Sequence, residues 1–285
     1  MKRKSTNILI AIMFCVGLSL LLYPTVSNFY NSWLQSKIIT EYSAQVDNLD
    51  KEVYRKCLEE AEEWNEALWE DGNHFSLSED MEAQYEDMLK ISEDDVMGYI
   101  EIPSINLTLP IAHGAEEETL KNAVGHLEWS SLPIGGENTH CVLSAHRGLP
   151  SAELFTNIDH LERGDKFYIH VLGETLTYVV DKIAVVEPND YTLLGKEEGK
   201  DYVTLFTCTP YGINSHRLLV RGVRAESINS ENGTLIVRNE VTEIDLMYLI
   251  PASLAIVSIP VFLVSFWGNK QKKKRKGSDK NEKKE

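Results

Sequence analysis

An uncharged segment of 22 residues near the C-terminus constrains this chain more than any other feature. It covers residues 246–267, and as a helix of about 1.5 Å rise per residue it spans about 33 Å, enough to cross the hydrocarbon core of a bilayer. Pro251 and Pro260 lie within it, and proline is better tolerated in membrane helices than in soluble ones. The basic run at residues 272–276 is typical of a stop-transfer signal. The sequence therefore predicts a transmembrane helix rather than a buried soluble helix.

A second apolar segment lies near the N-terminus, at residues 8–23, behind the basic residues 2–4. Such a segment is either an uncleaved anchor or the apolar region of a signal peptide, and residues 25–27 resemble a small-residue cleavage site. Because the uncharged run exceeds a typical signal core, a retained anchor is favoured. Either outcome keeps both basic ends in the cytoplasm and exports residues 28–245. The predicted location is the cell membrane, crossed by two segments.

The charge of the chain is distributed unevenly. Lys and Arg number 28 against 44 Asp and Glu, for a formal charge of −16, yet nine of the basic residues lie in residues 270–285. The exported body is therefore more acidic than the average, with a charge of about −25. A nucleic-acid-binding surface needs Lys and Arg clustered on the folded domain, so nucleic acid is excluded as a partner.

The exported segment begins with a Glu-rich region. Leu, Tyr and Trp recur at helical spacing over residues 36–89, which predicts two or three amphipathic helices, broken at residues 71–73 and restarted by Ser78 as an N-cap. A plain solvated stalk is the competing interpretation. Against it, Phe75 in the break is an aromatic residue in a loop, where it needs a packing partner.

From about Val96 the pattern changes to short β runs separated by turns. Seven or eight strands, with one helical stretch near residues 151–161, predict a mostly β fold closed into a barrel rather than an α/β sheet. The predicted strands are Gly98–Ile102, Leu107–Ile111, His140–Ala145, Lys166–Leu172, Thr175–Val186, Val203–Thr207 and Arg217–Arg224.

These boundaries give a predicted domain organisation. Its parts are residues 1–27 (basic end and N-terminal membrane segment), 28–95 (helices), 96–225 (barrel), 226–245 (polar linker), 246–267 (transmembrane helix) and 268–285 (basic tail).

Cys208 is the focus of the chemistry, because it ends a β run and precedes a loop containing Pro and Gly. The strand after that loop should pair antiparallel with the first, which returns Arg217 to the neighbourhood of Cys208. A guanidinium beside a thiol favours the thiolate and donates hydrogen bonds to a developing oxyanion. Taken alone, Arg217 is better interpreted as part of an ordinary salt bridge at the barrel rim.

A nucleophilic cysteine also needs a base, and His146 is the best candidate. It ends the β run 141–145, and strand alternation projects it and Cys208 toward the same rim. One Cys and one His without a matched carboxylate are a weak signal by spacing alone. Rival histidines are His126, the strongest, then His113 and His140, which suit packing, and His216, which points to the face opposite Arg217.

Several motifs resemble one family. The segment Thr204-Leu205-Phe206-Thr207-Cys208 matches the T-L-x-T-C signature of sortases, and residues 208–222 resemble the class C, pilin-polymerising branch. The resemblance covers about residues 97–224 and extends to the topology with two membrane segments. Further matches are Ile102-Pro103-Ser104-Ile105, Pro110-Ile111-Ala112-His113-Gly114, Gly125-His126-Leu127, Ser131-Leu132-Pro133-Ile134-Gly135-Gly136 and Ser144-Ala145-His146-Arg147-Gly148-Leu149-Pro150.

The resemblance implies a sortase β-barrel with Cys208 as nucleophile, His146 as acid and base, and Arg217 as the oxyanion- or substrate-positioning residue. It implies cleavage of an L-P-x-T-G-like sorting signal between Thr and Gly, with an acyl thioester on Cys208 resolved by an amine. For pilus assembly that amine is a pilin lysine. The implied partners are pilin or surface-protein substrates with a C-terminal sorting signal, and the lipid bilayer.

Class C sortases usually cover the site with a lid whose Asp-Pro-aromatic motif occupies the groove. The corresponding residues here are Asn73, His74 and Phe75. Because the acidic residue is missing, an ionic latch to the catalytic arginine is not expected, whereas a looser aromatic plug is.

Other functions compete with pilin polymerisation. A housekeeping sortase that attaches proteins to peptidoglycan is the first alternative, and a non-catalytic scaffold for pilins is the second. The chain has neither an H-E-x-x-H motif nor paired Cys motifs, so no metal and no cofactor is expected. Cys57 and Cys141 are either a disulfide or two free thiols.

Overall fold

The computed structural model describes the backbone of residues 2–72, 75–91 and 95–225, and the side chains of these residues from residue 12 onward. The chain divides into two compact units, one of residues 1–27 and 232–285 and one of residues 28–231. The predicted linker, C-terminal transmembrane helix and basic tail lie outside the described residues.

Helix α1 (Lys2–Asp47) joins the predicted N-terminal membrane segment to the first predicted amphipathic helix without a break. From Ile12 onward it is long and apolar enough to cross a membrane, and its most apolar stretch is not buried. One candidate membrane span is therefore present among the described residues, where the sequence predicted two for the whole chain.

Two further helices follow at the predicted places. Helix α2 (Lys51–Glu70) begins after Asp50, and helix α3 (Glu79–Tyr85) begins after Ser78. Each of these cap side chains accepts a hydrogen bond from a backbone N–H of the first turn, which satisfies a donor that has no partner within the helix. The N-cap predicted at Ser78 is confirmed.

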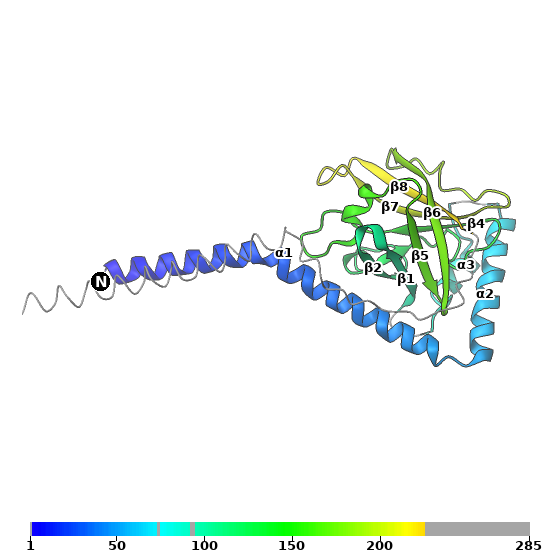
Figure 1. Cartoon of the computed structure of the whole chain (residues 1–285), viewed down its shortest axis with the longest axis horizontal. Coiled ribbons are helices and arrows are strands. Elements are labelled where there is room, and N and C mark those ends of the chain that lie inside the picture. The colour runs from blue at the N-terminus through cyan, green and yellow to red at the C-terminus, as the bar shows by residue number, and fades with distance from the viewer. Residues whose placement is uncertain (1, 73–74, 92–94, 226–285) are drawn as a thin grey trace, which may run out of the picture. The chain divides into compact units, whose positions relative to one another are not determined.

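The helices are packed against the barrel and are no solvated stalk. Helix α2 buries Ala61, Trp64 and Leu68 along one face, and Tyr85 of α3 packs with Trp64 at a ring-centroid separation of 6.3 Å. All four belong to the same apolar core as the interior of the barrel. Figure 1 shows α2 running along one side of the barrel.

Eight strands close into a barrel, as predicted. Their order is β1-β2-β3-β4-β7-β8-β6-β5, with β2–β3 and β4–β7 parallel and the other pairs antiparallel. The strands are β1 (Val96–Ile102), β2 (Leu107–His113), β3 (Val124–His126), β4 (Thr139–Ser144), β5 (Lys166–Val171), β6 (Glu174–Val186), β7 (Asp201–Thr209) and β8 (His216–Arg224).

Two elements of the barrel domain differ from the prediction, one strand and one helix. Strand β3 has three residues, too few for an alternating pattern, and the sequence analysis did not identify it. The helical stretch expected near residues 151–161 is a 3₁₀ helix, η3 (Leu154–His160), interrupted at Phe155. Two shorter 3₁₀ helices, η1 (Pro103–Ile105) and η2 (Thr119–Lys121), lie in the turns around β2.

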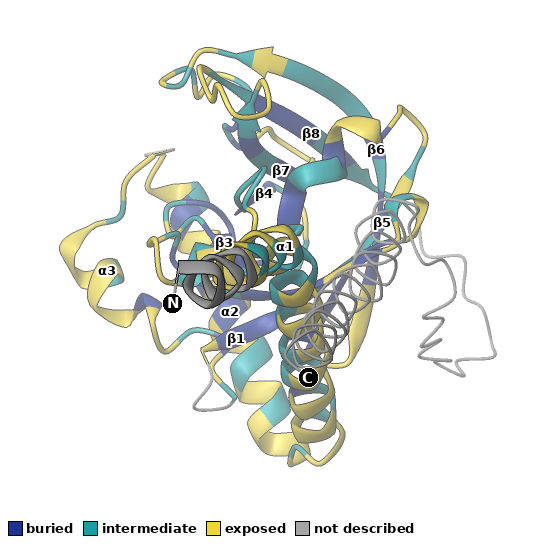
Figure 2. Cartoon of the chain, turned by 90° about the vertical axis from the view of Figure 1, so that its left-hand side faces the viewer, coloured by how far each residue is buried: buried dark blue, intermediate teal, exposed yellow. Residues whose placement is uncertain are grey.

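Alternation along the strands creates two apolar layers. Inward-facing residues such as Leu143, Leu205 and Val220 are fully buried in the barrel interior. The buried stretches of the strands are dark blue in Figure 2. On the opposite face of β4, β7 and β8, a smaller cluster forms around Val142 and Leu219. This outer cluster lies on the strand face to which Cys208 belongs by alternation.

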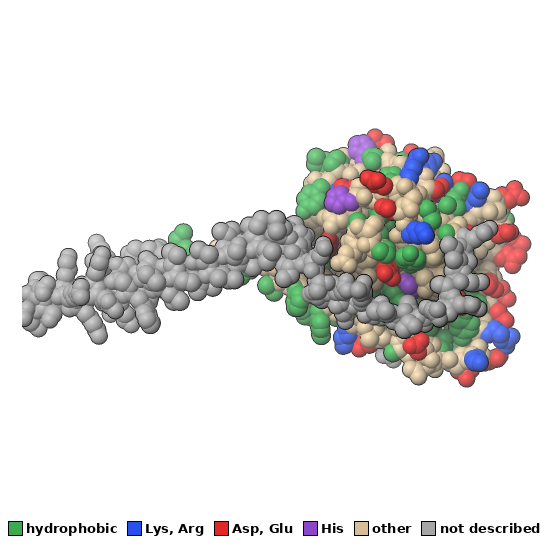
Figure 3. All heavy atoms as spheres, viewed as in Figure 1, with side chains coloured by type: hydrophobic (Ala, Val, Ile, Leu, Met, Phe, Trp, Pro, Cys, Tyr) green, Lys and Arg blue, Asp and Glu red, His purple; other side chains and the backbone are tan. Residues whose placement is uncertain are grey.

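Charges of both signs are mixed on the barrel. On the face drawn in Figure 3, Lys and Arg side chains lie scattered among Asp and Glu and do not form one basic stripe. Arg221 of β8 pairs with Asp181 at 2.6 Å and with Glu197 at 3.4 Å, and Arg224 pairs with Asp201 at 3.5 Å. These arginines are thus neutralised locally.

Candidate active site

Cys208 and Arg217 lie opposite each other on neighbouring strands. The antiparallel register of β7 and β8 pairs these two residues directly, so their side chains leave the same face of the sheet. Residues paired in this way have Cβ atoms about 4.5–5.5 Å apart. The return of Arg217 to Cys208, predicted from the connecting loop, is confirmed.

His146 lies on the other side of Cys208. Strands β4 and β7 pair in parallel up to Ser144 and Phe206. The contacts continue beyond the last pair, because the Thr207 hydroxyl donates to the Ala145 carbonyl at 2.7 Å. Cys208 of β7 therefore lies between Arg217 of β8 and the segment after β4, in which His146 follows the last strand residue by two positions. All three predicted site residues are half-buried.

Arg147 fixes the segment that carries His146, a role the sequence analysis did not assign. Its side chain is only 9% exposed and forms an ion pair with Asp159 of η3. The Nε donates to the Thr156 carbonyl at 3.1 Å, and Nη1 donates to the Thr209 hydroxyl at 3.1 Å. Arg147, which follows His146 in the chain, is thus bonded directly to Thr209, which follows Cys208.

The loops that follow the two strands also touch. Gly148 has a φ of +77°, and a Cβ atom on it would lie 2.9 Å from the ring of Tyr211. Glycine suits this position because other residues rarely adopt positive φ and because the aromatic ring leaves no space. Tyr211 thereby packs the β7–β8 loop against the loop after His146.

The Arg217 guanidinium is held by its own loop. Its Nη1 donates to the carbonyls of Asn214 at 3.2 Å and His216 at 3.1 Å. Both bonds come from one nitrogen, and arginine carries five N–H donors in a planar fork. The remaining donors suit an oxyanion or a substrate carbonyl near Cys208.

The rival histidines serve the fold instead. His126 is fully buried, with Nδ1 2.9 Å from the Tyr85 hydroxyl and Nε2 2.9 Å from the Ser131 carbonyl. His140 is buried between the Gly195 carbonyl and the Thr204 hydroxyl. Burial lowers the pKa of each to about 4, which keeps both imidazoles neutral.

His216 is partly exposed, with Nε2 3.4 Å from Glu187. Its register partner across the ladder is Thr209, one position beyond Cys208. Neighbouring strand residues point to opposite faces, so His216 faces away from Arg217.

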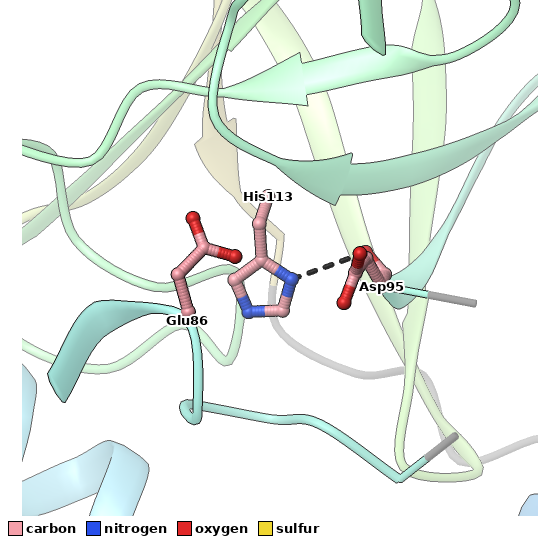
Figure 4. A group of neighbouring side chains, drawn as sticks. All are labelled: Glu86, Asp95 and His113. Atoms are coloured by element: carbon pink, nitrogen blue, oxygen red, sulfur yellow. Dashed lines mark hydrogen bonds between the residues drawn. The ribbon is translucent and has the colours of Figure 1, made fainter. Parts of the chain in front are cut away.

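Glu86, Asp95 and His113 form the cluster of possible metal ligands found among the described residues (Figure 4). The His113 ring nitrogens lie 3.1 Å from the Asp95 carbonyl and 2.7 Å from the Met88 carbonyl. Lys90 already pairs with Asp95 at 3.0 Å. Both ring nitrogens face carbonyl oxygens, which only accept hydrogen bonds, so at least one of the two nitrogens carries a proton and donates. The contact with Met88 ties the turn after α3 to the barrel.

An apolar surface extends from Cys208 along the outer face of the sheet. Phe206, two residues before Cys208, packs on the outer cluster together with Trp129 and Leu193. Phe75 covers part of it, with its ring centroid 5.4 Å from that of Trp129 and 5.6 Å from that of Tyr191. Phe75 thus has the packing partner that a loop aromatic needs. The other two predicted lid residues, Asn73 and His74, lie outside the described residues.

All four cysteines are free thiols in this structure. Cys141 is fully buried in the barrel, and burial raises the pKa of its thiol. Cys57 is half-buried on α2, and its pKa is raised for the same reason. Of the two alternatives for this pair, the structure shows free thiols and no disulfide.

Comparison with known proteins agrees with this architecture. Residues 100–225 match the sortase domain family. The crystal structure of sortase C1 from Streptococcus agalactiae is 46% identical, with a TM-score of 0.65, over 67% of this chain and 99% of that one. Sortase C of Streptococcus pneumoniae is 44% identical, with a TM-score of 0.61, over 67% and 97%. Sortase A of Bacillus anthracis is 26% identical over 221 residues, 78% of this chain and 95% of that protein.

The closed eight-stranded barrel and these similarities assign the chain to a class of proteins, the cysteine transpeptidases that act on sorting signals. The chain belongs to the sortase family, and its structural neighbours are class C sortases.

Proposed function

We propose that this protein is a membrane-anchored, extracellular, pilin-polymerising transpeptidase whose catalytic residues are Cys208, His146 and Arg217. The observation that carries the proposal is that Cys208, near the end of β7, lies between Arg217 of β8 and the segment after β4 that contains His146. Support for the pilin substrate comes from the similarity to Streptococcus pneumoniae sortase C, whose structure is described in terms of pilin substrate specificity.

The arrangement suits acyl transfer in two steps. The Cys208 thiolate attacks the carbonyl carbon of the Thr–Gly bond in the sorting signal, and Arg217 donates hydrogen bonds to the oxyanion that develops. His146 protonates the departing Gly amine, which leaves an acyl thioester on Cys208. The amine of a pilin lysine then attacks the thioester, His146 accepts its proton, and an isopeptide bond forms as the thiolate departs.

The rest of the chain fits the same task. We assign residues 96–225 to the catalytic domain, residues 28–95 to the helical and lid segment, and the two apolar segments to membrane anchors. Substrates emerge from export tethered by their own C-terminal helices, so tethering the enzyme raises the effective concentration of both partners. Phe75 acts as an aromatic plug on the outer cluster and needs no ionic latch.

The alternative with most support is a housekeeping role in which a peptidoglycan-precursor amine resolves the thioester. The similarity to Bacillus anthracis sortase A favours it over a non-catalytic scaffold. The two sortase functions share the first half-reaction and differ only in the amine that completes the second.

The test incubates the purified full chain with an L-P-x-T-G-containing peptide and either a lysine-bearing pilin fragment or a peptidoglycan-precursor amine, with the products identified by mass spectrometry. We expect an acyl-enzyme at Cys208 and an isopeptide product with the pilin fragment. Cys208→Ala should form neither, whereas the matched variant Cys57→Ala should form both. Turnover with the wall-precursor amine alone would establish the housekeeping function. Peptide binding without any acyl-enzyme would establish the scaffold.

A further inference from the structure

The first turns of α1 within the barrel unit present an amide face to the barrel. Asn28, Asn31 and Gln35 are spaced three and four residues apart and therefore lie on one side of the helix. Asn28 Oδ1 accepts a hydrogen bond from the Glu153 N–H at 2.9 Å, and Asn31 Nδ2 donates to the Ser151 carbonyl at 2.8 Å. Gln35 makes a similar bond, of 2.8 Å, to a carbonyl of the β2–β3 connection. This part of α1 is thereby fixed to the barrel.

The opposite side of the same turns is aromatic and exposed. Phe29, Tyr30 and Trp33 are 74%, 58% and 56% exposed, and the rings of Tyr30 and Trp33 lie 6.2 Å apart. Aromatic side chains with polar tips are typical of the boundary between a bilayer and water, where one end is apolar and the other is hydrated.

The charge pattern points to the same boundary. No charged residue occurs between Lys4 and Lys37, and a membrane crossing needs only about 20 apolar residues. The uncharged run is longer than one membrane crossing requires, and its C-terminal part, residues 28–36, carries the amide and aromatic faces. These turns therefore suit the lipid headgroup layer.

The barrel segment fixed to α1 is the one that carries the proposed acid and base. Ser151 and Glu153 lie between His146 and η3, and the N–H of Phe155 donates to the His146 carbonyl at 3.1 Å. The adjacent β7–β8 loop, which follows Cys208, exposes two apolar side chains, Tyr211 at 61% and Ile213 at 71%.

The geometry points to a membrane-facing active site: the rim that carries His146 and Cys208 rests at the headgroup layer of the outer membrane surface, held there by Asn28 and Asn31. The partner of the aromatic face and of the β7–β8 loop is the bilayer interface. This inference rests on the proposed anchor and site. It extends them by placing the nucleophile at the level where a membrane-tethered sorting signal leaves the lipid.

The test uses the full chain with Cys208→Ala and with Cys15 and Cys57 also replaced, so that a label attaches only where a new cysteine is introduced. The protein is reconstituted in phosphatidylcholine vesicles that contain a lipid with a nitroxide on its headgroup, which quenches a nearby fluorophore. A fluorescent label is attached through Ile213→Cys, or through Val53→Cys as a matched exposed apolar position on α2. We expect quenching of the label at position 213 and none at position 53. Equal quenching at the two positions, or no quenching at position 213, would overturn the inference.

A third label, at Tyr30→Cys, tests what covers the aromatic face. Quenching of this label supports the bilayer as its partner. Loss of quenching together with cross-linking between two chains through position 30 would show that a second copy covers the face, and would overturn the inference. Because Cys208→Ala lacks the nucleophile, these results do not depend on whether the enzyme polymerises pilins, which the peptide assay decides separately.

Discussion

Backbone hydrogen bonds, rather than side-chain packing, set the distance between Cys208 and Arg217. The two residues are register partners in the β7–β8 ladder, and the guanidinium is further held by the Asn214 and His216 carbonyls. A site built on strands keeps its geometry before substrate arrives, which is what electrostatic stabilisation of an oxyanion needs.

Replacing Arg217 should therefore affect turnover far more than stability. We expect Arg217→Ala to lower kcat/KM for a sorting-signal peptide by about 10²–10³-fold, the usual cost of losing an oxyanion donor. Arg217→Lys keeps the charge but loses the planar fork, so recovery should be partial. The measurements are steady-state peptide cleavage and thermal unfolding. Full activity of Arg217→Ala would remove this residue from the mechanism.

Buried neutral histidines make stability depend on pH. Burial lowers the pKa of His126 to about 4, whereas an unfolded histidine titrates near about 6.5. Between these values the unfolded chain binds more protons, so the free energy of unfolding falls as pH falls, by an amount on the order of a few kcal/mol. His126→Gln should flatten this slope in urea unfolding measured above and below about pH 6. The exposed His160→Gln is the control and should keep the slope.

At the scale of elements, the two loops after β4 and β7 behave as one unit. Arg147 bonds to Thr156 and Asp159 of η3 and to Thr209, the last residue of β7, while Tyr211 packs over Gly148. This double contact sets where His146 lies relative to Cys208.

Arg147→Ala removes the polar half of that contact. We expect the kcat for peptide cleavage to fall with little change in KM, because the substitution leaves the outer cluster beside Cys208 intact while the segment that carries His146 loses its support. Arg163→Ala, an exposed arginine before β5, is the matched control. A rise in KM with unchanged kcat would assign Arg147 to substrate binding instead.

Phe75 is the one residue of the proposed lid that the structure describes, and it packs on Trp129 and Tyr191. If it plugs the groove, Phe75→Ala should speed the reaction of Cys208 with a thiol reagent, followed by peptide mass spectrometry. The exposed aromatic Phe29→Ala serves as the control. Equal labelling rates in the wild type and in Phe75→Ala would show that the plug does not shield the nucleophile.

Much of this arrangement could be predicted from the sequence, and the exceptions have a physical cause. The β7–β8 pairing followed from a short loop between two strands, so the proximity of Arg217 to Cys208 is a local property. The contact of Arg147 with Thr209 joins residues 62 positions apart through a parallel pairing of β4 and β7. No local pattern encodes such a pairing. Strand β3 was not identified because three residues are too few to show an alternating pattern.

At the scale of the whole molecule, α1 is part of the catalytic unit as well as a candidate membrane span. Its barrel-facing side chains reach the segment after His146 through Asn31 and the far end of the barrel through Tyr42. Strand β6 separates these ends, because Val186 at its end faces Arg217 whereas Leu172 lies just before its start. The part of α1 that belongs to the barrel unit therefore couples the two ends of the barrel to one helix.

Tyr42 tests that coupling. Its hydroxyl is buried, donates to the Met97 carbonyl at 2.8 Å and accepts from the Leu172 N–H at 2.9 Å, and burial raises its pKa to about 12. Tyr42→Phe leaves both backbone groups without this partner, which should lower the free energy of unfolding by about 1–3 kcal/mol. Because the site lies at the other end of β6, peptide turnover well below the melting temperature should stay near wild type. Tyr54→Phe on α2 is the matched control. An unchanged unfolding midpoint for Tyr42→Phe would mean that α1 is not part of the cooperative unit of the barrel.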